Sequence, residues 1–92
     1  MIDTSRYTVH PNAAWRRVDD HVFVITPDNR QHELFGEVET VVWEACAAGP
    51  QSIPDLARLI VETFDVEGEA AMEDITEFVA SMVEAGLLDL AK

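Results

Sequence analysis

The sequence has little of the material that forms disulfides, zinc sites and membrane spans. It contains a single cysteine, Cys46, so no internal disulfide can form and no second cysteine can complete a structural zinc site. No run approaches the roughly 18 apolar residues that a membrane span needs. The first residues, Met1 to Tyr7, are polar where a signal peptide would be apolar. We therefore predict a cytoplasmic protein that is neither secreted nor embedded in a membrane.

Basic residues are also scarce. Six Lys and Arg residues stand against eighteen Asp and Glu residues, which gives a formal net charge of -12 at pH 7. A charge of this size repels nucleic acid and anionic lipid at long range. Partners of both kinds are therefore disfavoured.

The residue groupings that catalysis and metal binding require are missing as well. His10, His21 and His32 lie far apart, and none has a partner at a ligand spacing such as i, i+4 on a helix. The four glycines are isolated at predicted helix ends, so no phosphate loop or nucleophile elbow occurs. Cys46 lies beside Ala45 with no basic residue near it in sequence, which favours a small buried hydrophobe over a reactive thiol. We predict no catalytic residues, no metal, no cofactor and no enzyme activity.

What is present is the composition of one ordinary globular domain. The 92 residues are 48% hydrophobic and 26% charged, which is enough for a single core. Residues 1–13 show no periodicity and predict an irregular N-terminal arm, with the folded domain over 14–92. Alternating apolar residues then predict strands over 15–18, 21–26 and 31–35, separated by turns, and hence a three-stranded antiparallel meander.

Three helices are predicted after the strands. The first covers 37–48 and ends at Gly49-Pro50, the second follows a Ser52 cap, and the third covers about 69–85 and ends at Gly86. The segment 87–90 either forms a closing strand or fills the core. The fold class is therefore α+β, with helices on one face of a small sheet. The apolar helix stripes expected in the core are Val38, Val41, Val42 and Ala45; Ile53, Leu56, Ala57, Ile60, Val61 and Phe64; and Met72, Ile75, Val79, Met82 and Val83.

Trp43 lies away from the stripe of the first helix. Either this helix is covered on nearly all sides, or Trp43 is an exposed anchor for a partner; we favour the first interpretation. The third helix is rich in acidic residues, which favours a solvated face over paired catalytic carboxylates. The same acidity argues against this helix entering a DNA groove, as the third helix of a winged-helix protein would.

One flank of the third helix carries Ala71, Asp74 and Phe78 at the margin of the apolar stripe. The short third strand, if it lies at the sheet edge, would offer unpaired backbone N–H and C=O groups. An edge strand beside an apolar helix flank can accept a peptide as an added strand. We therefore predict a module that binds a peptide segment.

The sequence resembles the PqqD-like proteins, which are precursor-peptide recognition elements for ribosomally made, modified peptides. The resemblance covers about Ala14 to Leu90 and differs from the usual pattern at Phe35, where many relatives carry Asn. The pieces that carry it, in order, are Trp15 to Asp20 before an apolar strand, Leu34, Val42-Trp43, Gly49 with Ser52 to Leu56, Phe64 to Val66, Ile75, Phe78-Val79 and Gly86 to Leu88.

The resemblance implies a winged-helix-like domain with an N-terminal three-stranded sheet, and a leader peptide bound between the third strand and the third helix. It also implies a non-catalytic chaperone that serves a radical SAM maturase, a cyclodehydratase or a leader peptidase. On this sequence the peptide-binding residues would be His32, Glu33, Leu34, Phe35, Ala71, Asp74, Ile75, Phe78 and Met82.

Two other functions stay open at this stage. The first is an acidic protein-interaction or regulatory subunit that binds no precursor peptide, and the second is a winged-helix transcriptional regulator, whose DNA binding should fall steeply with salt. A homodimer is a further possibility, because an exposed third-strand edge could pair two copies in competition with peptide.

Overall fold

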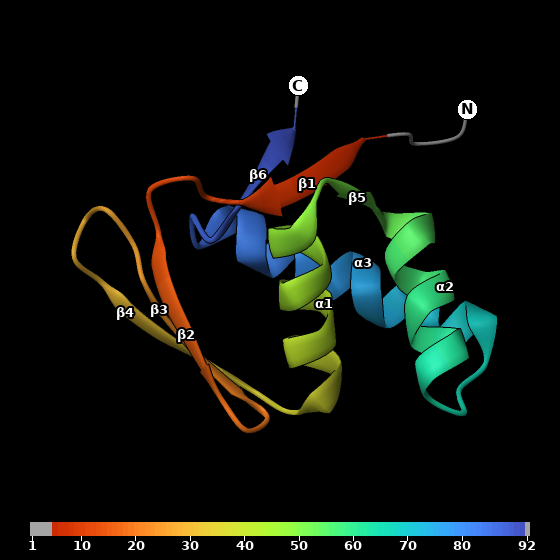
Figure 1. Cartoon of the computed structure of the whole chain (residues 1–92). Helices are drawn as coiled ribbons and strands as arrows, with labels where there is room; N and C mark the ends of the chain where they lie inside the picture. The colour runs from red at the N-terminus through yellow and green to blue at the C-terminus, as the bar shows by residue number, and fades with distance from the viewer. Residues whose placement is uncertain (1–4, 92) are drawn as a thin grey trace.

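The computed structural model describes residues 5–91 and contains an antiparallel meander near the N-terminus (Figure 1). Its strands are β2 (Ala14–Val18), β3 (His21–Ile25) and β4 (Gln31–Phe35), in the spatial order β2-β3-β4. The two connecting turns place Asp19 at φ 55° and Asn29 at φ 66°, a left-handed region that Asp and Asn tolerate better than most residues. The predicted meander is confirmed.

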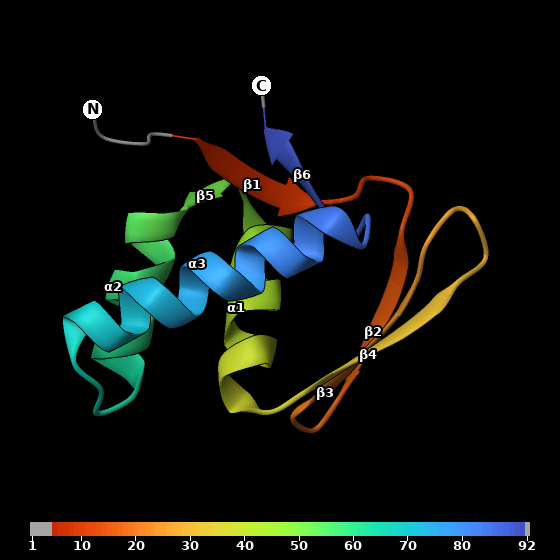
Figure 2. The ribbon, with the colours of Figure 1, turned by 180° about the vertical axis from the view of Figure 1, so that it is seen from behind.

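Three helices follow, with bounds close to those predicted: α1 (Glu37–Ala48), α2 (Ile53–Thr63) and α3 (Gly68–Glu84). Helices α1 and α2 lie side by side and α3 crosses them, behind them in Figure 1 and in front of them in Figure 2. The C-terminal half of α3 lies toward the meander and its N-terminal half lies toward α2 (Figure 2). This orientation places one end of α3 toward the meander and the other end beside α2.

A second sheet joins the two ends of the described chain. Its strands are β1 (Arg6–Val9), β5 (Gln51–Ser52) and β6 (Leu88–Ala91), in the order β5-β1-β6. The predicted irregular arm is therefore wrong for residues 6–9, while residues 1–4 lie outside the described part. Strand β1 pairs antiparallel with β6, for example Tyr7 with Leu90. Its four residues are too few to establish a period, which is why the sequence pattern did not predict it. Of the two alternatives for residues 87–90, a closing strand or a segment that fills the core, the structure shows the strand.

The core lies between the inner face of the meander and the helices. Its largest fully buried side chains include Trp43, Leu56, Ile75 and Leu88. Trp43 is 1% exposed and its ring contacts Trp15 of β2 edge to face, with centroids 5.8 Å apart. The prediction that α1 is covered on nearly all sides, and that Trp43 is not an exposed anchor, is confirmed.

Three predicted core residues are instead substantially exposed: Val61 at 38%, Met72 at 40% and Val83 at 39%. Each lies at the margin of its helix stripe, and Ala71 takes a buried place on α3. Helical periodicity identifies the side of a helix that faces inward. It does not determine how far the neighbouring element extends over the margin of that side.

Helix α2 begins with a complete capping box. The Ser52 hydroxyl accepts a hydrogen bond from the Asp55 backbone N–H at 3.2 Å, and the Asp55 carboxylate accepts one from the Ser52 N–H at 3.4 Å. Hydrogen bonding with the Ser52 side chain is the main cause that holds the pKa of Asp55 below its ordinary value of 3.8, and hydrogen bonding with the Ser52 backbone is the second.

This capping box predicts a specific acid sensitivity. Because the pKa of Asp55 is lowered in the folded state, its stabilising effect is complete above pH 3.8 and is lost as the pH falls through the folded value. Asp55→Asn should therefore lose less of its free energy of unfolding on acidification than the parent protein does. Urea melts between about pH 6 and pH 3 measure the difference. Equal losses in the two proteins would contradict the assignment.

Candidate peptide-binding groove

Strand β4 lies at an edge of the meander. Among residues 5–91 it pairs with β3 and with no other strand. Its outer edge therefore has backbone N–H and C=O groups that no strand partner satisfies, and such an edge can accept a further strand. The condition set for peptide binding, that the third strand lies at the sheet edge, is met.

The side chains of β4 divide between the two faces of the meander. In the β3–β4 register Leu34 lies opposite Val22 and His32 opposite Val24, and both valines are buried on the face toward the helices. Glu33 is exposed and belongs to the outer face. Of the four predicted β4 site residues, His32 and Leu34 thus face the helices.

Phe35 lies on the outer face, where it is 57% exposed. Its ring contacts His21, with ring centroids 4.7 Å apart. The backbone of Glu33 and Phe35 can therefore pair with an added strand. Their side chains can contact only those side chains of the added strand that also point to the outer face.

The predicted α3 residues share one face of the helix but differ in burial. Ala71, Ile75 and Met82 are buried in the core, so their side chains are not accessible on the surface of α3. Phe78 is partly buried and packs against this core, while Asp74 is exposed. Of the predicted α3 site residues, Phe78 and Asp74 are therefore the ones whose side chains an incoming peptide can reach without disturbing the core.

His32 has a feature that the sequence does not reveal. Its Nε2 atom is buried and has no hydrogen-bond partner in the described part of the chain. Buried polar atoms are nearly always paired, so such an atom calls for a partner from outside the structure or for a small movement of the ring. His32 is the polar side chain of β4 on the face toward the helices.

Residues 37–88, more than half of the chain, match the sequence model of the family described as coenzyme PQQ synthesis protein D (PqqD). The chain belongs to the PqqD family.

A solved structure shares the fold over most of the chain. It is described as "TbiB1 in Complex with the TbiA(beta) Leader Peptide" and superposes with a TM-score of 0.81 at 16% sequence identity. The match covers 89% of this chain and 94% of that chain, so it extends beyond the residues that match the PqqD family model. No curated protein sequence matches the chain significantly. The predicted α+β fold and PqqD-like family are confirmed.

One residue that could carry chemistry, Cys46, lies outside the candidate peptide-binding residues. Cys46 is fully buried on α1, and desolvation raises the pKa of its thiol from 9.0 to about 11, which suppresses the reactive thiolate. Among residues 5–91 no group of three or more His, Cys, Asp or Glu residues is placed to hold a metal ion. Within the same residues, no helix is both long enough and apolar enough to cross a membrane.

Proposed function

We propose that this PqqD-family protein binds the leader segment of a ribosomally made precursor peptide and presents it to a separate modifying enzyme. The leader adds as a strand to the free edge of β4, and its apolar side chains pack toward α3 beside Phe78. The observation that carries the proposal is the unpaired edge of β4, together with Phe78 of α3, which is partly buried and packs against the same core that contains Leu34 of β4. The fold shared with TbiB1, whose structure is described as a complex with a leader peptide, supports leader binding by this chain.

The protein's own contribution is binding and not bond making. Holding the leader raises the effective concentration of the attached core peptide at the modifying enzyme. That enzyme would be a radical SAM maturase, a cyclodehydratase or a leader peptidase, and the protein would act in the cytoplasm. The free β4 edge could also pair with a second copy, and this dimer would compete with the leader.

DNA binding is the weaker alternative. Helix α3 would be the recognition helix of a winged-helix regulator, but it contains five acidic residues and no basic one: Glu69, Glu73, Asp74, Glu77 and Glu84. Contact with phosphates requires the opposite sign of charge.

A leader-binding protein should be encoded beside a short precursor-peptide gene and a modifying enzyme, and that precursor peptide is the ligand for the test. Calorimetry should detect saturable binding of the leader segment and none of the core segment. The neighbouring modifying enzyme should process the precursor faster when the protein is added. The proposal would be contradicted if the leader did not bind, or if the rate of processing were the same with and without the protein.

A further inference from the structure

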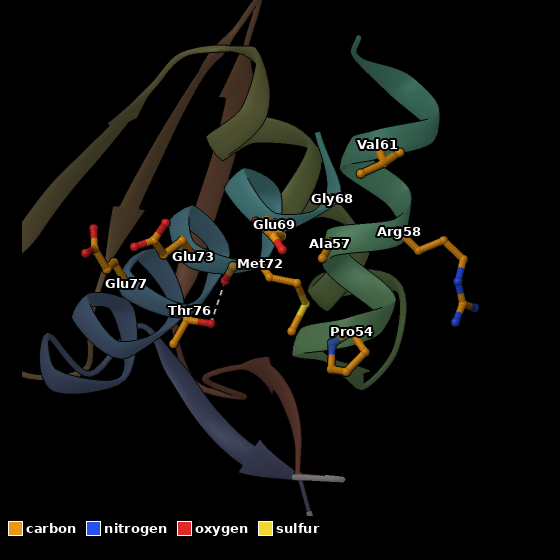
Figure 3. A pocket seen from close by; sticks show the side chains of 10 residues that line it. All are labelled: Pro54, Ala57, Arg58, Val61, Gly68, Glu69, Met72, Glu73, Thr76 and Glu77. Carbon is orange, nitrogen blue, oxygen red and sulfur yellow. Dashed lines mark hydrogen bonds between the residues drawn. The ribbon is translucent and has the colours of Figure 1, made fainter. Parts of the chain in front are cut away.

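A second surface lies between α2 and α3. An open groove of about 860 Å³ runs between these helices (Figure 3). Its apolar floor includes Ala57, Val61 and Met72, and the side chain of Met72 lies between the two helices (Figure 3). We call this surface the α2–α3 groove.

The floor of this groove is incompletely covered. Val61 and Met72 continue the apolar stripes of their helices, yet they are among the more exposed large apolar residues. An open apolar groove with a polar rim is the usual form of a docking site. Methionine suits such a site because its unbranched side chain adapts to different partners.

The rim on the α3 side is acidic. Glu69, Glu73 and Glu77 follow one another at intervals of four residues and line the groove, so they form a row along the helix. The one basic residue among the lining residues is Arg58, and its side chain extends away from the groove (Figure 3). Between Arg58 and Lys92 the sequence has nine acidic residues and neither Lys, Arg nor His.

The α2–α3 groove and the proposed leader site occupy different flanks of α3. Met72 and Phe78 are six residues apart, and at about 100° per residue their side chains point in widely separated directions. A ligand in one site therefore leaves the other free.

We propose that the α2–α3 groove docks an amphipathic helix of a partner protein, with apolar residues on the floor and Lys or Arg facing the α3 carboxylates. A groove between two helices can accept a third helix, and the acidic rim favours a helix that carries positive charge. A second copy of this chain does not fit, because it has the same net charge of -12 and its adjacent Arg16 and Arg17 lie on strand β2. The proposal does not depend on leader binding.

The test uses ¹⁵N-labelled protein and a designed amphipathic helical peptide of Leu and Lys, with a Leu and Glu peptide of the same pattern for comparison. The Lys peptide should bind saturably, with an affinity that falls as salt is added, and should shift the amides around Val61 and Met72. The Glu peptide should not bind. Val61→Asp should weaken the Lys peptide about tenfold or more.

A charge swap separates specific docking from general attraction. Glu69→Lys with Glu73→Lys should reverse the preference between the two peptides. Glu33→Lys with Glu84→Lys changes the net charge by the same amount outside the groove, and should leave the preference unchanged. Circular dichroism confirms that each variant is folded. The proposal is overturned if both double variants behave alike, if the shifts map to the outer face of the meander, or if Val61→Asp disrupts a dimer of the protein.

Discussion

Leu56→Ala should lower the free energy of unfolding by about 2 to 5 kcal/mol, the range for truncating a fully buried leucine. Leu56 is 0% exposed and lies in the same buried cluster as Ile60 and Ile75. Its removal leaves a cavity in the core that the surrounding side chains can fill only in part. Urea melts at neutral pH measure the change.

Trp43→Ala should have an effect of similar size, because Trp43 is equally buried and contacts Trp15. Its Nε1 atom is buried and has no hydrogen-bond partner among residues 5–91, so Trp43→Phe should cost less than Trp43→Ala. Ile25→Ala is the control, since Ile25 is exposed on the outer face of the meander and should change stability by no more than about 0.5 kcal/mol. A change below that size for Leu56 or Trp43 would show that the residue is not part of the core.

Phe78→Ala should weaken leader binding about tenfold or more, which corresponds to at least about 1.4 kcal/mol. Backbone pairing with β4 is largely indifferent to the sequence of the leader, so the affinity depends on one or two apolar anchors. Phe78 is the aromatic residue on the α3 flank, and its ring is only partly buried. The same change should therefore reduce stability less than Leu56→Ala does. Calorimetry with the leader, beside urea melts, separates the two effects.

Two control variants define the position of the leader anchor. Phe23→Ala removes the same side chain from the outer face of the meander, where Phe23 is exposed. Glu33→Ala removes an exposed side chain of β4 itself. Both should leave leader affinity nearly unchanged. If Phe23→Ala weakened binding as much as Phe78→Ala, the leader would lie on the outer face of the meander.

The helices and the meander were predictable because their signals are local. The Ser52 capping box, the turns at Asp19 and Asn29, and the helical period of the apolar residues lie within each segment. Strand β1 was missed because four residues are too few to show a period, although Tyr7, Thr8 and Val9 are types that strands favour. Its pairing with β5 and β6, which are distant in sequence, could not be predicted from a local pattern. The family resemblance was also accessible from the order of apolar residues along the chain.

The site was predictable only in part. A strand alternates its faces, so the run from His32 to Phe35 could already be divided into two inward and two outward residues. The burial of Ala71, Ile75 and Met82 depends on tertiary packing, and so does the unpartnered Nε2 atom of His32. The α2–α3 groove could not be predicted from the sequence, because the helical period places Val61 and Met72 toward the core. Their exposure depends on how α2 and α3 pack against each other.

An NMR titration of ¹⁵N-labelled protein with its cognate leader tests the central proposal most directly. Strand addition predicts large amide shifts from His32 to Phe35 and around Phe78, together with contacts between leader backbone protons and those of β4. The amides of α2 and of residues 65–68 should remain unchanged. Leader-induced shifts confined to α2 and residues 65–68, with β4 unaffected, would contradict the proposed groove even if the leader bound tightly.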